Sequence, residues 1–196
     1  MLNKKIVITI FGSSKPGPTD KEYIIAYNLG KMLAQYGFIV CNGGYGGIME
    51  ATAKGAIDNN GKSIGVVTQH FKRKSNPYID EIVEVKSLVD RLLKLIELGD
   101  AYVVMKGSTG TLVELSMVWE FMNKSVMKSK PIIIIGDFWK PVIQTLKTEL
   151  IHEGLEDVTK FVTLVKSPEE CVDLLKIRFD DRATINGKMR LRINKK

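Results

Sequence analysis

The chain has 196 residues, of which 44% are hydrophobic, and this is typical of one folded domain and excludes a chain that is disordered throughout. No run of about 18 apolar residues is present, which excludes a membrane-spanning helix. The net charge of +7 suggests nucleic acid as a partner, but six Lys or Arg of residues 182–196 account for most of it, leaving 23 basic and 22 acidic residues elsewhere.

The placement of this charge predicts a nearly neutral domain over residues 1–179 and a basic tail over residues 180–196. We expect the tail to pack little, with weak binding to a polyanion as the alternative, and we do not expect nucleic acid to be a partner. The N-terminus lacks the apolar stretch of a secretion signal. Together with two cysteines in apolar contexts, Cys41 and Cys171, this predicts a cytoplasmic protein with free thiols and no membrane partner.

The first half of the chain alternates short apolar runs with segments of helical periodicity. In chain order we predict a strand at 5–11, a helix at 20–36, a strand at 38–41, a glycine-rich loop at 42–47, a helix at 48–59, a strand at 64–67, a polar loop at 68–80 and a short strand at 82–85.

The second half continues the alternation. Ser87 begins a helix with Asp90 as its capping-box partner. After it we predict a strand at 101–105, a glycine-rich turn at 107–110, a helix at 111–123, a strand at 132–135, a helix at 140–152, a strand at 161–165 and a helix at 168–178.

Strict alternation of helices with continuously apolar strands predicts a parallel sheet that is covered on both faces. We therefore expect a single α/β domain with a Rossmann-like, doubly wound sheet of about six or seven strands. In such sheets ligands bind outside the carboxyl ends of the strands. The loops that follow Phe11, Cys41 and Met105 lie at those ends, and all three contain glycine.

Glycine-rich turns between a strand and a helix allow backbone N–H groups to approach a phosphate, which the helix dipole also favours. Three such loops at one sheet edge predict a site for a phosphorylated nucleotide, although their spacing matches neither the dinucleotide fingerprint nor the P-loop. The candidate phosphate-binding residues are Gly12, Ser13, Ser14, Gly43, Gly44, Gly46, Gly47, Lys106, Gly107, Ser108, Thr109, Gly110 and Thr111.

The segment from Gly107 to Glu114 (GSTGTLVE) resembles the P-G-G-x-G-T-x-x-E motif of the Lonely Guy (LOG) family. Residues 11–14 and 42–49 are similar to two further loops of that family, and Arg91 falls where it carries a catalytic arginine. The similarity extends over about residues 5–136. It implies a phosphoribohydrolase that acts on cytokinin nucleotides or other nucleoside 5′-monophosphates, needs no cofactor or metal, and forms a homodimer with active sites near the subunit boundary.

Some residues depart from this pattern. Lys106 and Ser108 stand where the family has Pro and Gly, and Lys106 adds a possible phosphate contact. Residues 49–51 and 54–56 are closer to the related molybdenum-cofactor carrier proteins, which bind a phosphorylated pterin without hydrolysing it. A non-catalytic carrier or sensor of molybdenum cofactor or a nucleotide is therefore the alternative function.

The resemblance assigns the catalytic roles to Arg91 and Glu114. Glu114, kept ionised near its helix N-terminus, would stabilise an oxocarbenium-like ribose and activate water. Arg91 would stabilise the departing base or the phosphate. The competing local interpretations are a Thr111–Glu114 capping box, a surface position for Arg91 and a helix-dipole role for Glu50, which is the next candidate carboxylate.

The helix predicted at 111–123 is apolar on nearly every side. One face of a sheet cannot bury all of this surface, so the pattern favours a homodimer on its own account.

Overall fold

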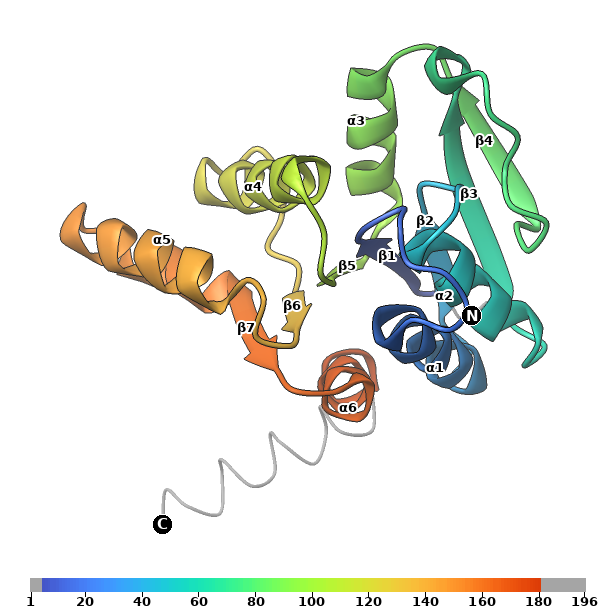
Figure 1. The fold of residues 1–196 in the computed structure, drawn as a ribbon. Coiled ribbons are helices and arrows are strands. Elements are labelled where there is room, and N and C mark those ends of the chain that lie inside the picture. Colours follow the sequence, from blue (N-terminus) through green and yellow to red (C-terminus); the bar gives the residue numbers. More distant parts are fainter. Residues whose placement is uncertain (1–4, 181–196) are drawn as a thin grey trace.

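A computed structural model of the protein describes residues 5–180, so that nearly all of the predicted basic tail lies outside the described residues. Its centre is one sheet of seven parallel strands in the order β4-β3-β2-β1-β5-β6-β7, which confirms the predicted doubly wound α/β fold (Figure 1). The strands are β1 (Val7–Phe11), β2 (Ile39–Asn42), β3 (Lys62–Thr68), β4 (Glu81–Val85), β5 (Ala101–Val104), β6 (Ile132–Ile135) and β7 (Val162–Val165).

The strand order reverses at β1, and this reversal fixes where a ligand can bind. Ile8 of β1 pairs with Val40 of β2 on one side and with Ala101 of β5 on the other. The chain moves outward through β2, β3 and β4, and then returns to the centre through β5. The loops after β1 and β5 therefore leave the sheet in opposite directions and open a crevice between them.

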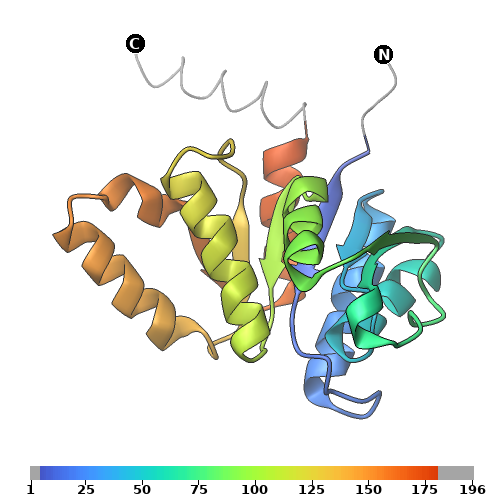
Figure 2. The ribbon, with the colours of Figure 1, turned by 90° about the horizontal axis from the view of Figure 1, so that it is seen from above.

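Helices cover both faces of the sheet, as the continuously apolar strands require. In Figures 1 and 2 one face carries α1 (Lys21–Gln35), α2 (Ile48–Ile57) and α6 (Pro168–Phe179), and the other carries α3 (Leu88–Leu98), α4 (Thr109–Asn123) and α5 (Lys140–His152). Two short 3-10 helices, η1 (Gln69–Phe71) and η2 (Glu156–Phe161), complete the described elements. None of the helices within residues 5–180 is sufficiently long and apolar to cross a bilayer.

The apolar surface of α4 is better covered within one subunit than its sequence predicts. The segment η2 packs beside α4, and the indole Nε1 of Trp119 donates a hydrogen bond of 2.9 Å to the carbonyl of Val158. Among the large apolar side chains of α4, Val113 is the exposed one, at 52%. Exposed apolar side chains are also present on α3, namely Leu88, Val89 and Leu93.

Candidate functional site

Three glycine-containing loops interlock at the carboxyl ends of the central strands. The N–H of Ser13 donates to the carbonyl of Lys106, and the N–H of Ile48 donates to the carbonyl of Ser13, at 3.0 and 2.9 Å. Gly47 has a φ of +71°, and a Cβ there would lie 2.3 Å from the Ser13 carbonyl oxygen. The loops after β1, β2 and β5 are therefore fixed against one another by backbone contacts.

The start of α4 is open toward solvent. Ser108 is the N-cap residue, but its side chain makes no capping hydrogen bond. The first intrahelical contact runs from the Leu112 N–H to the Ser108 carbonyl at 3.0 Å, so the preceding N–H groups of the first turn have no partner in the helix. Of this segment, Thr111 is buried, whereas Lys106, Ser108, Thr109 and Gly110 are exposed. A Cβ on Gly107 would lie 2.1 Å from the Thr111 hydroxyl oxygen, which explains the glycine.

The beginning of α4 corrects two expectations from the sequence. The helix begins at Thr109 rather than at residue 111, so Thr111 and Glu114 are its third and sixth residues. A capping box needs the N-cap and the third residue, and the local interpretation of Thr111 and Glu114 is therefore wrong. Ser108 has a φ of −109°, which any side chain can adopt, so the loop accommodates serine in place of the family's glycine.

A pocket of about 480 Å³ lies between the loops after β1 and β5. Its lining includes Ser13, Lys15, Asp20, Glu22, Lys106 and Ser108. The Nζ of Lys106 pairs with Oε1 of Glu22 at 2.7 Å and lies 5.9 Å from the ring centroid of Phe138. Hydrogen bonding to Lys106 lowers the pKa of Glu22, and both members of this ion pair line the pocket.

Arg91 lies in the first turn of α3 and is held by backbone carbonyls. Its Nε donates to the Val66 carbonyl at 2.8 Å, and its Nη2 donates to the Gly43 carbonyl at 3.0 Å. Its Cζ lies 5.4 Å from the centroid of the Tyr45 ring. A Cβ on Gly43 would be 1.5 Å from Nη2, so the guanidinium occupies the space of a side chain. Arg91 is thus an oriented, half-buried cation rather than a free surface residue.

This placement of Arg91 rests on a helix start that the sequence predicts correctly. Ser87 Oγ accepts from the Asp90 N–H at 3.0 Å, and Asp90 Oδ2 accepts from the Ser87 N–H at 3.1 Å. The capping box fixes the first turn of α3, and the next residue along the helix is Arg91. The loop after β2, strand β3 and α3 therefore position one guanidinium together.

Glu114 lies on α4 within the electrostatic field of Arg91. Loss of hydration raises its pKa to about 7, and the positive charge of Arg91 opposes this effect only in part. Within residues 5–180, no hydrogen bond or ion pair joins the two side chains. Loss of hydration therefore outweighs the helix N-terminus that was expected to keep Glu114 ionised; the residue lies in the second turn of α4, beyond the free N–H groups.

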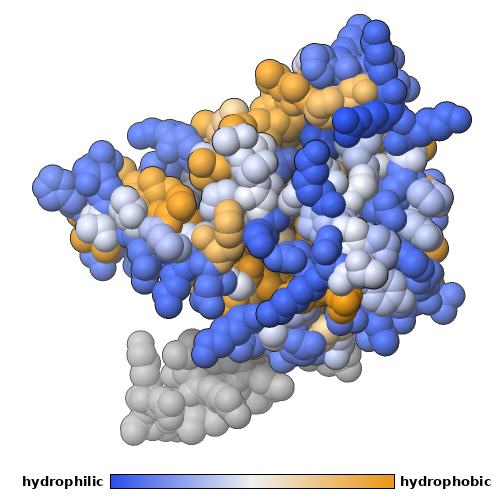
Figure 3. All heavy atoms as spheres, in the orientation of Figure 1, coloured by the Kyte–Doolittle hydropathy of each residue, from blue (hydrophilic) through white to orange (hydrophobic). Residues whose placement is uncertain are grey.

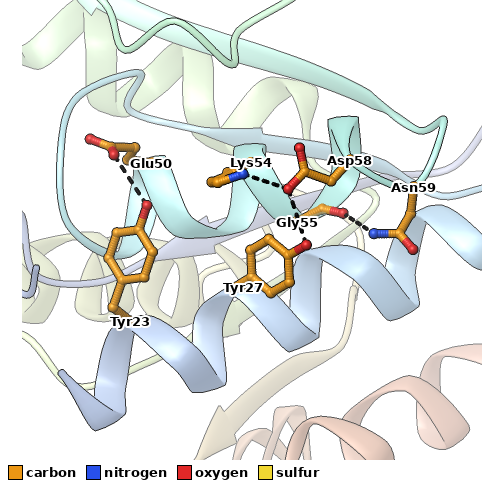
Figure 4. Close-up of polar contacts among 7 residues, drawn as sticks. All are labelled: Tyr23, Tyr27, Glu50, Lys54, Gly55, Asp58 and Asn59. Carbon is orange, nitrogen blue, oxygen red and sulfur yellow. Dashed lines mark hydrogen bonds and ion pairs between the residues drawn. The ribbon is translucent and has the colours of Figure 1, made fainter. Parts of the chain in front are cut away.

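Glu50, the alternative carboxylate, is engaged in packing between helices (Figure 4). Tyr23 of α1 donates a hydrogen bond of 3.1 Å to Glu50 Oε1 on α2. One turn further along α1, Tyr27 donates to Asp58 at 3.0 Å, beside the ion pair of Asp58 with Lys54.

Residues 54–56, which resemble the carrier proteins, also have a packing role. A Cβ on Gly55 would lie 2.1 Å from the Tyr27 carbonyl oxygen, so α1 and α2 meet backbone to backbone. Cys41 is fully buried in the core beside the sheet edge, and this burial raises the pKa of its thiol to about 12, as is typical of an unreactive cysteine.

Sequence reasoning missed the residues that brace the loop after β2. Asn42 Oδ1 accepts from the Gly44 N–H at 2.8 Å, and the Tyr45 hydroxyl donates to the Thr68 carbonyl at 3.1 Å. Asn76 donates its side-chain amide to the Tyr45 carbonyl and its N–H to the Gly44 carbonyl, both at 2.8 Å. The tyrosine inside a glycine run was visible in the sequence, but its partners lie more than 20 positions away.

Comparisons with known proteins identify relatives of this chain. The chain is 32% identical to an uncharacterized protein of Archaeoglobus fulgidus over 121 residues. These residues cover 61% of this chain and 80% of the relative. The cytokinin riboside 5′-monophosphate phosphoribohydrolase of Rhodococcoides fascians is 24% identical over 166 residues, which cover 81% of this chain and 82% of that one.

Among solved structures, the molybdenum cofactor binding protein of Rippkaea orientalis has the same fold. It superposes with a TM-score of 0.70 at 24% identity, over 89% of this chain and 97% of that chain. The sequence profile of the SLOG cluster4 family matches residues 5–172, which is most of the chain and includes every loop of the site. The chain therefore belongs to the SLOG cluster4 family, in agreement with its resemblance to LOG proteins.

Proposed function

We propose that the protein hydrolyses the N-glycosidic bond of a nucleoside 5′-monophosphate and releases the free base and ribose 5-phosphate. The observation that carries this proposal is that Glu114 lies within the electrostatic field of Arg91, while Arg91 is held by the glycine loop after β2. Glu114 caps no helix, so a local capping role does not explain it. The name of the Rhodococcoides fascians relative, a phosphoribohydrolase, supports the same reaction class.

The proposed mechanism begins with binding of the 5′-phosphate. The free N–H groups at the start of α4, with Thr111 and the loops at 12–14 and 43–47, would hold the phosphate and so position the ribose. The binding energy of this remote phosphate contact can then lower the barrier for breaking the glycosidic bond.

In the bond-breaking step, the C1′–N bond breaks and its electron pair leaves with the base. Arg91 has five N–H donors, and two of them already bind the carbonyls of Val66 and Gly43. The remaining donors would stabilise the negative charge on the base, which is then protonated by solvent. Glu114 in its ionised form would stabilise the oxocarbenium-like ribose and accept a proton from the water that attacks C1′.

A non-catalytic carrier or sensor of a phosphorylated ligand is the second candidate function. Lys106 favours it, because the residue stands where the LOG motif has proline and brings a cation to the wall of the 480 Å³ pocket. The Rippkaea orientalis protein of the same fold is named for binding molybdenum cofactor. Such a protein would bind its ligand through the same loops and release no product.

A panel of nucleoside 5′-monophosphates, analysed by chromatography for free base, separates the two functions. We expect at least one monophosphate to yield base and ribose 5-phosphate, and the matching unphosphorylated nucleoside to react far more slowly. Arg91→Ala should abolish most of this turnover. Binding of a monophosphate without release of any base would refute the hydrolase and leave the carrier.

We also propose that the protein is a cytoplasmic homodimer. Leu88, Val89 and Leu93 of α3 and Val113 of α4 are exposed apolar side chains. Figure 3 shows an apolar area near the top of this face, in the region where Figure 1 places α3. A second subunit would remove this surface from water. Light scattering should report a dimer at micromolar concentration and a monomer for Val89→Glu; a wild-type monomer would contradict the proposal.

A further inference from the structure

An exposed aromatic ring borders the site beyond Arg91. Phe71 ends the 3-10 helix η1, directly after β3 and at the same carboxyl edge of the sheet as the glycine loops. Its ring is 38% exposed and lies outside both apolar cores of the described residues. Its place at the carboxyl edge of the sheet leaves this ring accessible to a ligand that is bound by the glycine loops.

Phe71 is connected to the catalytic candidates through Tyr45. The rings of Tyr45 and Phe71 meet edge to face, with centroids 5.4 Å apart, and the Arg91 guanidinium lies 5.4 Å from the Tyr45 centroid. The Tyr45 ring cannot move freely, because its hydroxyl accepts from the Thr68 N–H at 3.0 Å and donates to the Thr68 carbonyl. Arg91, Tyr45 and Phe71 therefore form one continuous, braced wall.

We propose that Phe71 stacks against the base of the nucleotide, an inference that rests on the proposed function. In the proposed mechanism the phosphate of the ligand binds at the start of α4, and the ribose lies beside Glu114, which is further along α4. Arg91 donates to the base near the glycosidic nitrogen. The rest of the base therefore extends past Arg91 toward Tyr45 and Phe71. The ligand class is a monophosphate that carries a planar aromatic ring, rather than a bare sugar phosphate.

A second exposed ring provides a matched control. Phe138 follows β6 and is 51% exposed, but it lies beside Lys106 at the opposite flank of the site. It therefore borders the proposed phosphate end and should not contact the base. Substitutions at Phe71 and Phe138 compare two exposed phenylalanines that differ in their position relative to the ligand.

The test measures dissociation constants of AMP and of ribose 5-phosphate by calorimetry. For Phe71→Leu we expect AMP binding to weaken about tenfold, as loss of one base–aromatic stack predicts, with ribose 5-phosphate binding unchanged. Phe71→Trp should restore AMP binding, and Phe138→Leu should leave the ratio of the two constants unchanged. Circular dichroism melts confirm that each variant is folded.

The inference is overturned if Phe71→Leu weakens the binding of AMP and of ribose 5-phosphate equally, or changes neither dissociation constant. It is also overturned if wild-type protein binds AMP no more tightly than ribose 5-phosphate. Measuring both ligands in the Glu114→Gln background, where turnover should be about 100-fold lower, keeps the outcome independent of the proposed reaction. Selective loss of AMP affinity without any base release supports stacking and refutes the hydrolase. Base release with unchanged AMP affinity in Phe71→Leu supports the hydrolase and refutes stacking.

Discussion

Replacing Glu114 with glutamine should stabilise the protein at alkaline pH. The pKa of this carboxyl is raised by burial from an ordinary value of 4.5 to about 7. Between these values the native state binds a proton that the unfolded chain does not, so the free energy of unfolding falls as pH rises through this window. The difference between the two pKa values corresponds to about 3 kcal/mol, which is an upper value because the side chain is only partly buried.

Glutamine keeps the size of the side chain but cannot ionise. The free energy of unfolding of Glu114→Gln should therefore not fall as pH rises through this window. Urea unfolding at about pH 5 and about pH 8 measures the effect on wild type and variant. The advantage of the variant should be small at the lower pH and approach about 3 kcal/mol at the higher pH, or about 6–12 °C in Tm. Glu120→Gln is the control, because Glu120 is an exposed residue of the same helix.

The pH dependence decides the outcome. An advantage of Glu114→Gln that is equal at both pH values, or absent at both, would show that Glu114 titrates normally and would refute the reasoning. If Glu114 acts in catalysis, the same variant should lose about 100-fold in turnover, equivalent to about 3 kcal/mol in the transition state. Greater stability combined with lower activity is the pattern expected of a buried functional charge.

Further predictions concern the rest of the site. The kcat/KM for base release should rise with pH around an apparent pKa of about 7, because the water-activating Glu114 must be ionised; a flat profile would exclude that role. Gly43→Ala places a methyl group 1.5 Å from Nη2 of Arg91 and should reduce turnover about as much as Arg91→Ala, whereas unchanged activity would show that the guanidinium position is unimportant. Lys106→Ala removes an exposed ion pair with Glu22, so chemical denaturation should show little change in the free energy of unfolding. If Lys106 contacts the phosphate, the same variant should raise KM for monophosphates but not for nucleosides.

The strands were predictable because a strand that is buried on both faces appears in the sequence as a continuous run of apolar residues. Four isoleucines follow Pro131, and all four lie in β6 as a fully buried run. The start of α3 was equally clear, since Ser87 and Asp90 satisfy each other within four residues. Signals of this kind are local. They were sufficient to predict the fold class and the helix start that positions Arg91.

The failures concern features that depend on distant residues. The start of α4 was placed two residues late, because Ser108 caps it without a side-chain hydrogen bond while Thr111 and Glu114 imitate a capping box. The contact between Tyr45 and Arg91 joins residues from separate elements, and no local pattern encodes it. The raised pKa of Glu114 depends on how completely the surrounding chain removes water, which sequence periodicity does not report.

The pairing of β1 with β5 has a consequence for how the protein is made on the ribosome. Strands β1 to β4 neighbour one another in sequence order, so this half of the sheet can assemble as soon as it emerges. One side of β1 has no partner until Ala101–Val104 is synthesised, and α4 emerges later still. The site is therefore completed late in synthesis, and until then the nascent chain exposes an apolar strand edge that makes it a candidate for chaperone binding.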